Sequence, residues 1–373
     1  MELSFNLISI ILFYSFIGYL IFKNRSKIEF HKIYLLYKTK TGIKIIDKLS
    51  KNRLWKYWGY FGIPVGFLGM GWIIYELLKF GGNFQILIPG GSAGSAGPVM
   101  FIPIWTFLIC ISVIILVHEG AHGVVARAHK IKIKSTGIGL FTIIPLAFVE
   151  PDEKQLENAS PRTQLSIFAA GPFANLCTGA IFAIMYFFLL MPAMGSLLDS
   201  NGLEIISVTN NLPASEAGII PGDIILSLNG VATPTTTKFE EEILKVTPGD
   251  EIEMILENRV IKMNTLEHPT RENMAYIGVN FKSHLVPQSD TLLSRLLAKS
   301  MLYLSELFFW LIVLNIGIAL VNLLPLGPVD GGRMLKTTFD KLIKNKSLSR
   351  SLWFIISMAA LGLLILNLTS SMF

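Results

Sequence analysis

Residues 101–130 read FIPIWTFLICISVIILVHEGAHGVVARAHK, a long apolar run that ends among polar and basic residues. Within it lies the motif His118-Glu119-Gly120-Ala121-His122. Positions four apart lie on one face of a helix, so both imidazoles can reach a single metal ion. Glu119 projects near the same edge, where it can accept a proton from a metal-bound water. The stretch therefore predicts a metal site inside an apolar helix.

The setting of the motif strengthens this interpretation. A charged side chain in the middle of a membrane-spanning helix costs about 2.5 to 3.5 kcal/mol on insertion scales, so such groups usually mark function. The alternative is a pair of hydrogen-bonded core histidines with a paired glutamate. The cost of placing these groups in lipid favours the metal site.

The composition indicates a membrane protein. The 373-residue chain is 52% hydrophobic and only 16% charged, and its mean hydropathy is +0.56. Soluble domains carry roughly a quarter charged residues, so the deficit of charge is informative. Cys110 and Cys177 lie in apolar runs without a CxxC pair, which argues against disulfides and cysteine zinc sites. The net charge of +6 falls beside apolar segments, which indicates membrane topology rather than nucleic-acid binding.

Six apolar segments meet or nearly meet the roughly 20 residues that a helix needs to cross a bilayer. We therefore expect an α-helical integral membrane protein with about six transmembrane helices. The first segment lacks a basic leader and a small-residue cleavage site, which favours an uncleaved helix over a signal peptide. The six segments are residues 4–22, 57–79, 101–127, 163–191, 300–326 and 352–372.

Basic loops predict the orientation of the chain. Residues 23–56, 127–134 and 333–350 are rich in lysine and arginine and fall on one side if the helices alternate. By the positive-inside rule that side is the cytoplasm, so the N-terminus and residues 192–299 lie outside. Glu119 lies about eight residues, or roughly 12 Å, from the cytoplasmic end of its helix. We expect water to reach the metal site from the cytoplasmic side.

Two segments between the helices carry weaker patterns. Residues 136–150 (TGIGLFTIIPLAFVE) combine glycines with β-branched residues, which predicts a β-hairpin that dips into the membrane. Backbone of this kind survives in lipid only where protein or water satisfies it. Residues 81–99 are rich in glycine and serine, which predicts a flexible loop.

A soluble α+β insert occupies residues 200–285. Alternating patterns predict strands, with a short helix near Thr237–Val246. The expected strands are residues 203–208, 223–228 and 251–256.

The phrase ASEAGIIPGDIILSLNG (214–230) resembles PDZ domains attached to bacterial and archaeal proteases. In those domains the peptide-binding turn usually precedes the first of these strands, whereas here the similar YIGV comes last, from Tyr276 to Val279. The resemblance implies a circularly permuted PDZ-like domain that binds a C-terminal peptide near Tyr276 and Gly278. The alternative is a β-rich spacer without a ligand.

A catalytic zinc takes three protein ligands and leaves a fourth position to water, so the histidine pair needs a partner. The best candidate is Asp330 in NLLPLGPVDGG (322–332), which follows the fifth apolar segment. Pro325 and Pro328 end the helix and the two glycines permit tight turns, so the carboxylate can turn back into the bundle. Spacing alone leaves open that Asp330 merely caps the next helix, which begins near Arg333.

HExxH in one membrane helix, followed by NxxPxxxxDGG in a later one, is similar to the site-2 protease family of intramembrane metalloproteases. The resemblance covers about residues 101–332, interrupted by the insert. It implies that His118, His122 and Asp330 bind Zn²⁺ and that Glu119 is the catalytic base.

The same resemblance nominates substrate-binding residues. Gly137 and Gly139 match the glycine-rich strand of the family, and Asn175 follows the small-residue motif Ala170-Gly171-Pro172. Asn175 and Asn322 carry amides that can hydrogen-bond a substrate backbone or a developing oxyanion. Helix packing explains both asparagines equally well.

These observations predict a zinc-dependent endopeptidase that cuts membrane-anchored proteins in or near their transmembrane segments, as in regulated intramembrane proteolysis. A helical substrate must unwind to be cut, and the hairpin at 136–150 can capture it as an added strand. We expect the PDZ-like insert to filter substrates. The predicted domains are N-terminal helices with a basic loop, two parts of a catalytic core and the insert between them: residues 1–99, 100–195, 200–285 and 296–373.

Three other readings remain open. A catalytically idle scaffold or receptor would use the PDZ-like domain alone, but Glu119 and all three ligand positions are present. A metal-binding transporter would leave the glutamate of HExxH and the insert unexplained. A membrane protease that cuts prenylated tails would use a glutamate as third ligand, which the DGG context of Asp330 disfavours.

Overall fold

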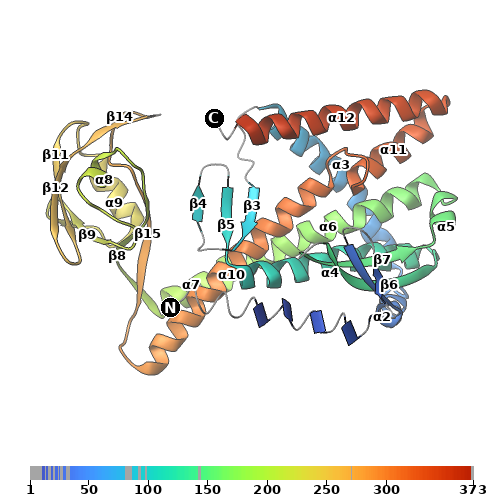
Figure 1. Cartoon of the computed structure of the whole chain (residues 1–373), viewed down its shortest axis with the longest axis horizontal. Helices are drawn as coiled ribbons and strands as arrows, with labels where there is room; N and C mark the ends of the chain where they lie inside the picture. Colours follow the sequence, from blue (N-terminus) through green and yellow to red (C-terminus); the bar gives the residue numbers. More distant parts are fainter. Residues whose placement is uncertain are drawn as a thin grey trace. The chain divides into compact units, whose positions relative to one another are not determined.

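The computed structural model divides the chain into two compact units (Figure 1). The helical unit comprises Met1–Met185 and Glu306–Phe373, and the insert unit comprises Tyr186–Ser305. The structure describes residues 34–79, 86–90, 94–96, 99–141, 144–269 and 271–370, with a few positions between 11 and 30.

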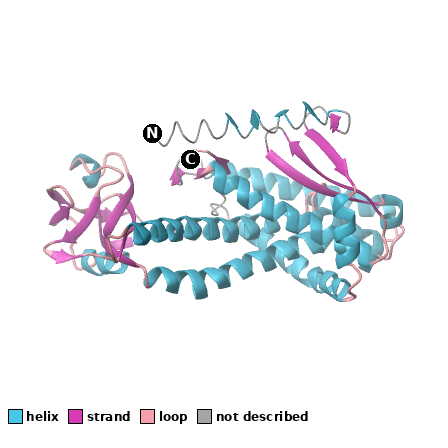
Figure 2. Ribbon diagram, turned by 90° about the horizontal axis from the view of Figure 1, so that it is seen from below, coloured by secondary structure: helices cyan, strands magenta, loops and turns pink. Residues whose placement is uncertain are grey.

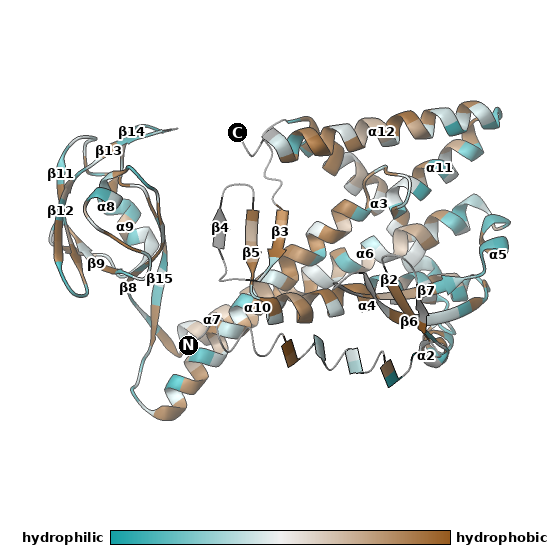
Figure 3. Ribbon diagram, viewed as in Figure 1, coloured by the Kyte–Doolittle hydropathy of each residue, from teal (hydrophilic) through white to brown (hydrophobic). Residues whose placement is uncertain are grey.

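Five helical segments among the described residues are long and apolar enough to cross a membrane. Their apolar character is visible along α3, α4, α10 and α12 in Figure 3. Each coincides with a predicted segment, whereas the predicted helix at 4–22 lies outside the described residues apart from isolated positions. The spans are Leu54–Leu78 (α3), Ile104–Ala128 (α4), Pro161–Gly195 (α6 and its continuation), Leu292–Asn322 (α10) and Lys346–Thr369 (within α12).

Small residues bring the helices of the helical unit together. A Cβ on Gly59 of α3 would lie 2.8 Å from Val125 of α4, and one on Gly66 would lie 2.8 Å from Met334. Such close approach of backbones is how helices associate in lipid, where no hydrophobic force drives them together. The resulting apolar cluster includes Val125, Ala170 and Met334 and is built mainly from the second half of α4 and the first half of α6 (Pro161–Met185).

A four-stranded sheet lies beside these helices in the order β1-β2-β6-β7 (Figure 2). β6 (Ile133–Phe141) and β7 (Ile144–Pro151) pair antiparallel within the region where a hairpin was predicted. β1 (Ile28–Phe30) and β2 (Tyr34–Thr39) come from the basic loop, and β2 pairs with β6. The pattern of this loop did not predict strands, because charged residues interrupt its alternation.

The expectation of a wholly flexible loop at 81–99 was wrong for part of the segment. β3 (Ile86–Pro89) pairs with β5 (Val99–Ile102) in parallel, and β4 (Gly94–Ala96) pairs with β5 on its other side. The apolar run of β3 favours an extended strand as soon as a partner is available. Leu87 and Ile102 pack in a cluster with Trp310 of α10, which anchors this sheet to the helical unit.

The insert unit is built on a sheet in the order β12-β11-β9-β8-β15. The helix α9 (Thr236–Ile243) and the three predicted strands are confirmed, and α8 (Pro213–Glu216) and α9 lie against the sheet in Figure 1. Leu203, Ile225 and Met254 are fully buried between them. The strands are β8 (Leu198–Val208), β9 (Ile224–Leu228), β11 (Glu251–Leu256), β12 (Val260–Asn264) and β15 (Val279–Pro287), with β10 (Val231–Ala232) beside β9.

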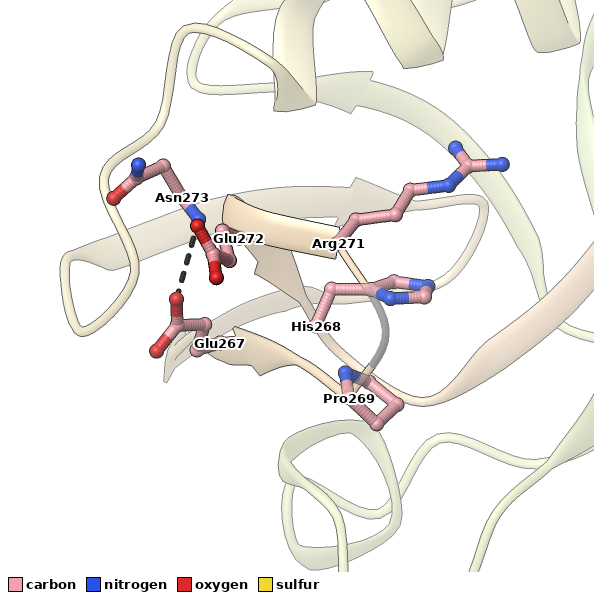
Figure 4. A pocket seen from close by; sticks show the side chains of 6 residues that line it. All are labelled: Glu267, His268, Pro269, Arg271, Glu272 and Asn273. Carbon is pink, nitrogen blue, oxygen red and sulfur yellow. Dashed lines mark hydrogen bonds between the residues drawn. The ribbon is translucent and has the colours of Figure 1, made fainter.

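A separate hairpin of the insert unit, β13 (Leu266–His268) and β14 (Arg271–Tyr276), carries a polar surface pocket (Figure 4). The backbone N–H of Asn273 donates to Glu267 Oε1 at 3.2 Å, and the His268 ring packs edge-on against Tyr276.

Candidate metal centre

His118 and His122 project from one face of α4 toward Asp330. Asp330 Oδ2 lies 3.1 Å from His118 Nε2 and 3.2 Å from His122 Nε2, and the two Nε2 atoms are 3.2 Å apart. His118 and Asp330 are 8% and 9% exposed, so the cluster is buried within the helical unit. A metal ion needs several His, Cys, Asp or Glu side chains close together. Among the described residues, the cluster of His118, His122 and Asp330 is the group that meets this condition.

Asp330 reaches the histidines because the chain turns sharply after α10. Asp330 is the first residue of α11 (Asp330–Leu342), and seven residues separate it from the end of α10. A Cβ on Gly332 would overlap the carbonyl of Leu326, so only glycine lets the first turn of α11 pack on this backbone. Trp353 Nε1 of α12 (Lys346–Ser370) donates to Gly332 O at 2.9 Å and fixes the turn. The alternative role of Asp330 as a simple helix cap does not explain its contact with both imidazoles.

The donor set and its spacing fit one zinc ion. Zinc takes histidine nitrogen and carboxylate oxygen, and ligands about 2.05 Å from the ion in a tetrahedron lie about 3.3 Å apart. The three ligand atoms, 3.1 to 3.2 Å from one another, match that spacing. Three protein ligands leave one tetrahedral position for water or substrate.

The other ring nitrogens of the histidines are also held. His122 Nδ1 donates to the Ile167 carbonyl of α6 at 2.7 Å, which leaves Nε2 with a lone pair for a metal. His118 Nδ1 lies 3.2 Å from the side-chain amide of Asn175, which is fully buried. A carboxamide can present either end, and its Oδ1 has no other partner among the described residues. Asn175 therefore accepts from His118 Nδ1–H when Nε2 binds a metal.

The small-residue motif of α6 makes room for this site. A Cβ on Gly171 would lie 2.3 Å from His122 Nε2 and 2.8 Å from His118 Nε2. Pro172 follows inside the helix, and because it has no N–H it leaves the carbonyl of Phe168, next to Ile167, without its helical partner. The sequence identified Ala170-Gly171-Pro172 as a motif, but it did not predict that Gly171 packs directly against the two histidine rings.

Glu119 lies beside β7. The backbone N–H of Val149 donates to Glu119 Oε2 at 3.3 Å. Thr136 of β6 lies opposite Val149, and the N–H of Val149 points away from it, toward the open edge of the sheet. The carboxylate of the HExxH motif therefore faces an unpaired strand edge.

The other predicted site residues lie in different surroundings. Gly137 and Gly139 are in β6, where a Cβ on either would lie 2.3 to 2.4 Å from a carbonyl of β2. Asn322 is the last residue of α10 and makes no side-chain hydrogen bond to a described residue. Tyr276 and Gly278 belong to the insert unit, just before β15.

A helix with two histidine ligands and a glutamate, and an aspartate brought to it among apolar spans, define a zinc metalloprotease of the membrane-helical class. The sequence model of peptidase family M50 matches residues 106–366 of the chain, and the chain belongs to that family. The predicted membership in this protease family, the enzyme class and zinc as its cofactor are confirmed.

The chain is also similar to individual proteins, at sequence identities below 30%. The uncharacterized protein MJ0971 of Methanocaldococcus jannaschii is 28% identical over 323 residues, which cover 84% of this chain and 80% of that protein. A Clostridium acetobutylicum protein named "Putative zinc metalloprotease CA_C1796" is 26% identical over 47% of this chain and 57% of its own length. The solved PDZ domain of an SdrC-like protein from Listeria monocytogenes is 19% identical and covers 22% of this chain and 87% of that domain, with a TM-score of 0.21.

Proposed function

We propose that this protease hydrolyses peptide bonds in or next to the transmembrane segments of membrane-anchored proteins, with its active site reached from the cytoplasmic side. The observation that carries the proposal is the convergence of His118, His122 and Asp330 on one point between apolar helices. The basic loops between the spans support the orientation.

Each residue of the site has a chemical role in this proposal. His118, His122 and Asp330 hold the ion, which when bound supplies the Lewis acidity that activates water and polarises a scissile carbonyl. Glu119 accepts the proton of the attacking water and delivers it to the leaving amine. Asn175 keeps the His118 ring in the orientation and tautomer that present Nε2.

The open edge of β7 is the proposed docking edge for substrate. The other side of the hairpin is occupied, because β2 pairs along β6 from Thr39 to Tyr34. A substrate segment that has unwound can add to β7 by main-chain hydrogen bonds. Its carbonyl would take the Val149 N–H from Glu119, so docking would free the carboxylate where the peptide lies.

Proline substitution tests this docking edge. Period-two geometry puts the N–H groups of Ala147 and Val149 on the open edge, and proline there leaves the hydrogen bonds to β6 intact. We expect Ala147→Pro and Val149→Pro to lower cleavage of a model transmembrane substrate at least tenfold with unchanged zinc content, and Ala147→Ser and Val149→Ala to cleave normally. Full activity of Ala147→Pro, which does not touch the Glu119 contact, would contradict strand addition.

Metal analysis combined with cleavage tests the catalytic assignment. Removal of a general base costs about 10²- to 10⁴-fold in rate, so Glu119→Gln should keep zinc and lose cleavage in reconstituted vesicles. Asp330→Asn should lose both zinc and cleavage. Cleavage by Glu119→Gln near the wild-type rate would rule out the proposed base.

The insert unit is proposed to be a PDZ-like substrate filter. β15 is the last strand of the sheet, and Phe281 on it packs against Phe239 of α9 at 4.8 Å between ring centroids. The turn before it contains Gly278, with φ of +82° and no room for a Cβ beside Leu212. A sheet edge beside a helix and a glycine turn can receive a peptide C-terminus as an added strand.

The ends of the insert permit a clean deletion. Leu198 pairs with Pro287 across β8 and β15, so a short linker can replace the residues between them. We expect the shortened protein to retain zinc and to cut a wider range of substrates, or the same ones at a changed rate. Identical behaviour toward every substrate would instead support a spacer.

A further inference from the structure

The helix α2 (Thr41–Leu49) presents an exposed face made of two lysines and two aliphatic side chains. Ile46 on its inner face is 5% exposed and packs in the apolar cluster of the helical unit. The outer face carries Ile45 and Leu49, which are 61% and 46% exposed. Two exposed lysines accompany them four residues apart, Lys44 and Lys48. A face of this composition suits the boundary between lipid and water.

The position of α2 places this face at such a boundary. Leu49 ends α2 and Leu54 begins the span α3, so the residues between them cover at most about 17 Å. On its inner side α2 contacts the last turns of the span α4: Ile46 lies against Gly123, and Asp47 Oδ1 accepts from Arg127 Nε at 2.6 Å. α2 therefore lies beside the end of one candidate span and is joined to the start of another by a short connection.

The positive charges around this face lack protein partners. Asp47 is the acidic residue of the described segment 34–56, and Arg127 already binds it. Six basic side chains of the segment form no ion pair with a described residue: Lys40, Lys44, Lys48, Lys51, Arg53 and Lys56. We propose that this face of α2 binds the anionic surface of the lipid bilayer and thereby holds β2 against the hairpin β6–β7.

The link from α2 to the hairpin is short and direct. One residue separates β2 from α2. Thr136 of β6 donates to the Thr39 carbonyl at 3.1 Å, and a Cβ on Gly42 would lie 2.8 Å from its Oγ1. β2 then runs along Gly137 and Gly139, one strand away from the edge that faces Glu119. The lipid contact stands without the proposed function, whereas its effect on cleavage rests on that function.

Amide hydrogen exchange of the full chain in vesicles tests the contact. The protein is reconstituted in phosphatidylcholine alone and in vesicles where phosphatidylglycerol replaces a third of it. Each lysine near an anionic surface strengthens binding by about fivefold. We expect amides of residues 34–49 to exchange several-fold more slowly in the anionic vesicles, and Lys44→Gln/Lys48→Gln to lose most of this difference. High salt should reduce the difference as well, because it screens exposed charges.

A matched variant separates this face from general attraction to lipid. Lys341→Gln/Lys344→Gln removes the same charge from another basic loop predicted to lie on the same side of the membrane, and it should keep the lipid dependence. Equal exchange in both vesicles, or equal loss in the two double variants, would overturn the proposal. If amide exchange depends on the lipid but the cleavage rate is the same in both vesicles, the link to the hairpin is wrong. Absence of any cleavage would count against the proposed function alone.

Discussion

Gly171 lies over the imidazoles of His118 and His122 at a distance that leaves no room for a side chain. We expect Gly171→Ala to displace His122 and to weaken zinc binding roughly 10- to 100-fold, because overpacking of a tight site costs about 1–3 kcal/mol. Competition titration with a zinc chelator measures this change. Gly120→Ala is the control, since a Cβ there meets nothing within 4 Å. Equal zinc affinity of the two variants would show that the site tolerates a methyl group.

Asn175 acts on the metal through His118. We expect Asn175→Ala to lower zinc affinity about 10- to 100-fold, as is usual for the hydrogen-bond partners of metal ligands. Asn175→Asp should recover most of the affinity, because its carboxylate still accepts from His118 Nδ1–H. If both variants bind zinc like the wild type, the amide serves helix packing instead.

The candidate ligands could be nominated from sequence because residue type and spacing carry their chemistry. His118 and His122 lie one helical turn apart, and the DGG context marked Asp330. The role of Gly171 could not be predicted, because it depends on the distance between α4 and α6. The contact of the Val149 N–H with Glu119 could not be predicted either, because every residue except proline carries a backbone donor.

At the scale of elements, long apolar runs predicted α3, α4, α6, α10 and α12, because only continuous apolar segments satisfy the bilayer. The pairing of β2 with β6 was not predicted, since strand partners far apart in sequence share no local signal. The helix α2 was missed because it has nine residues and owes its stability to packing on α4.

The helix α9 of the insert unit responds to pH in a direction that its contacts determine. The hydrogen bond from Lys245 lowers the pKa of Glu242 below its ordinary value, and Lys238 adds to this. A lowered pKa in the folded state stabilises the fold above the unfolded-state pKa, and the contribution disappears as pH falls through the lowered value.

We therefore expect the insert unit of the full chain to become more sensitive to proteolysis as the pH falls through the acid range. Glu242→Gln should remove part of this dependence. Glu240→Gln, at an exposed side chain of the same helix that forms no ion pair with a described residue, should leave it unchanged. Limited proteolysis over a pH series makes the comparison. Parallel pH curves for the wild type and Glu242→Gln would contradict the assignment.

At the scale of the whole molecule, the metal site connects parts of the chain that are 208 to 212 residues apart. Chelation should therefore loosen the contact between α4 and α11, raise amide exchange around Asp330 and lower the melting temperature. The insert unit should exchange as before, because it forms a compact unit of its own. Exchange that rises equally in both units on chelation would show that they unfold together.

The order of the ligands along the chain has a consequence for biosynthesis. His118 and His122 leave the ribosome long before Asp330, and the whole insert is made between them. A nascent chain that has threaded its HExxH helix into the translocon still lacks the third ligand. The complete ligand set therefore exists only after about nine-tenths of the chain has been synthesised, so a shorter nascent chain lacks the full zinc site.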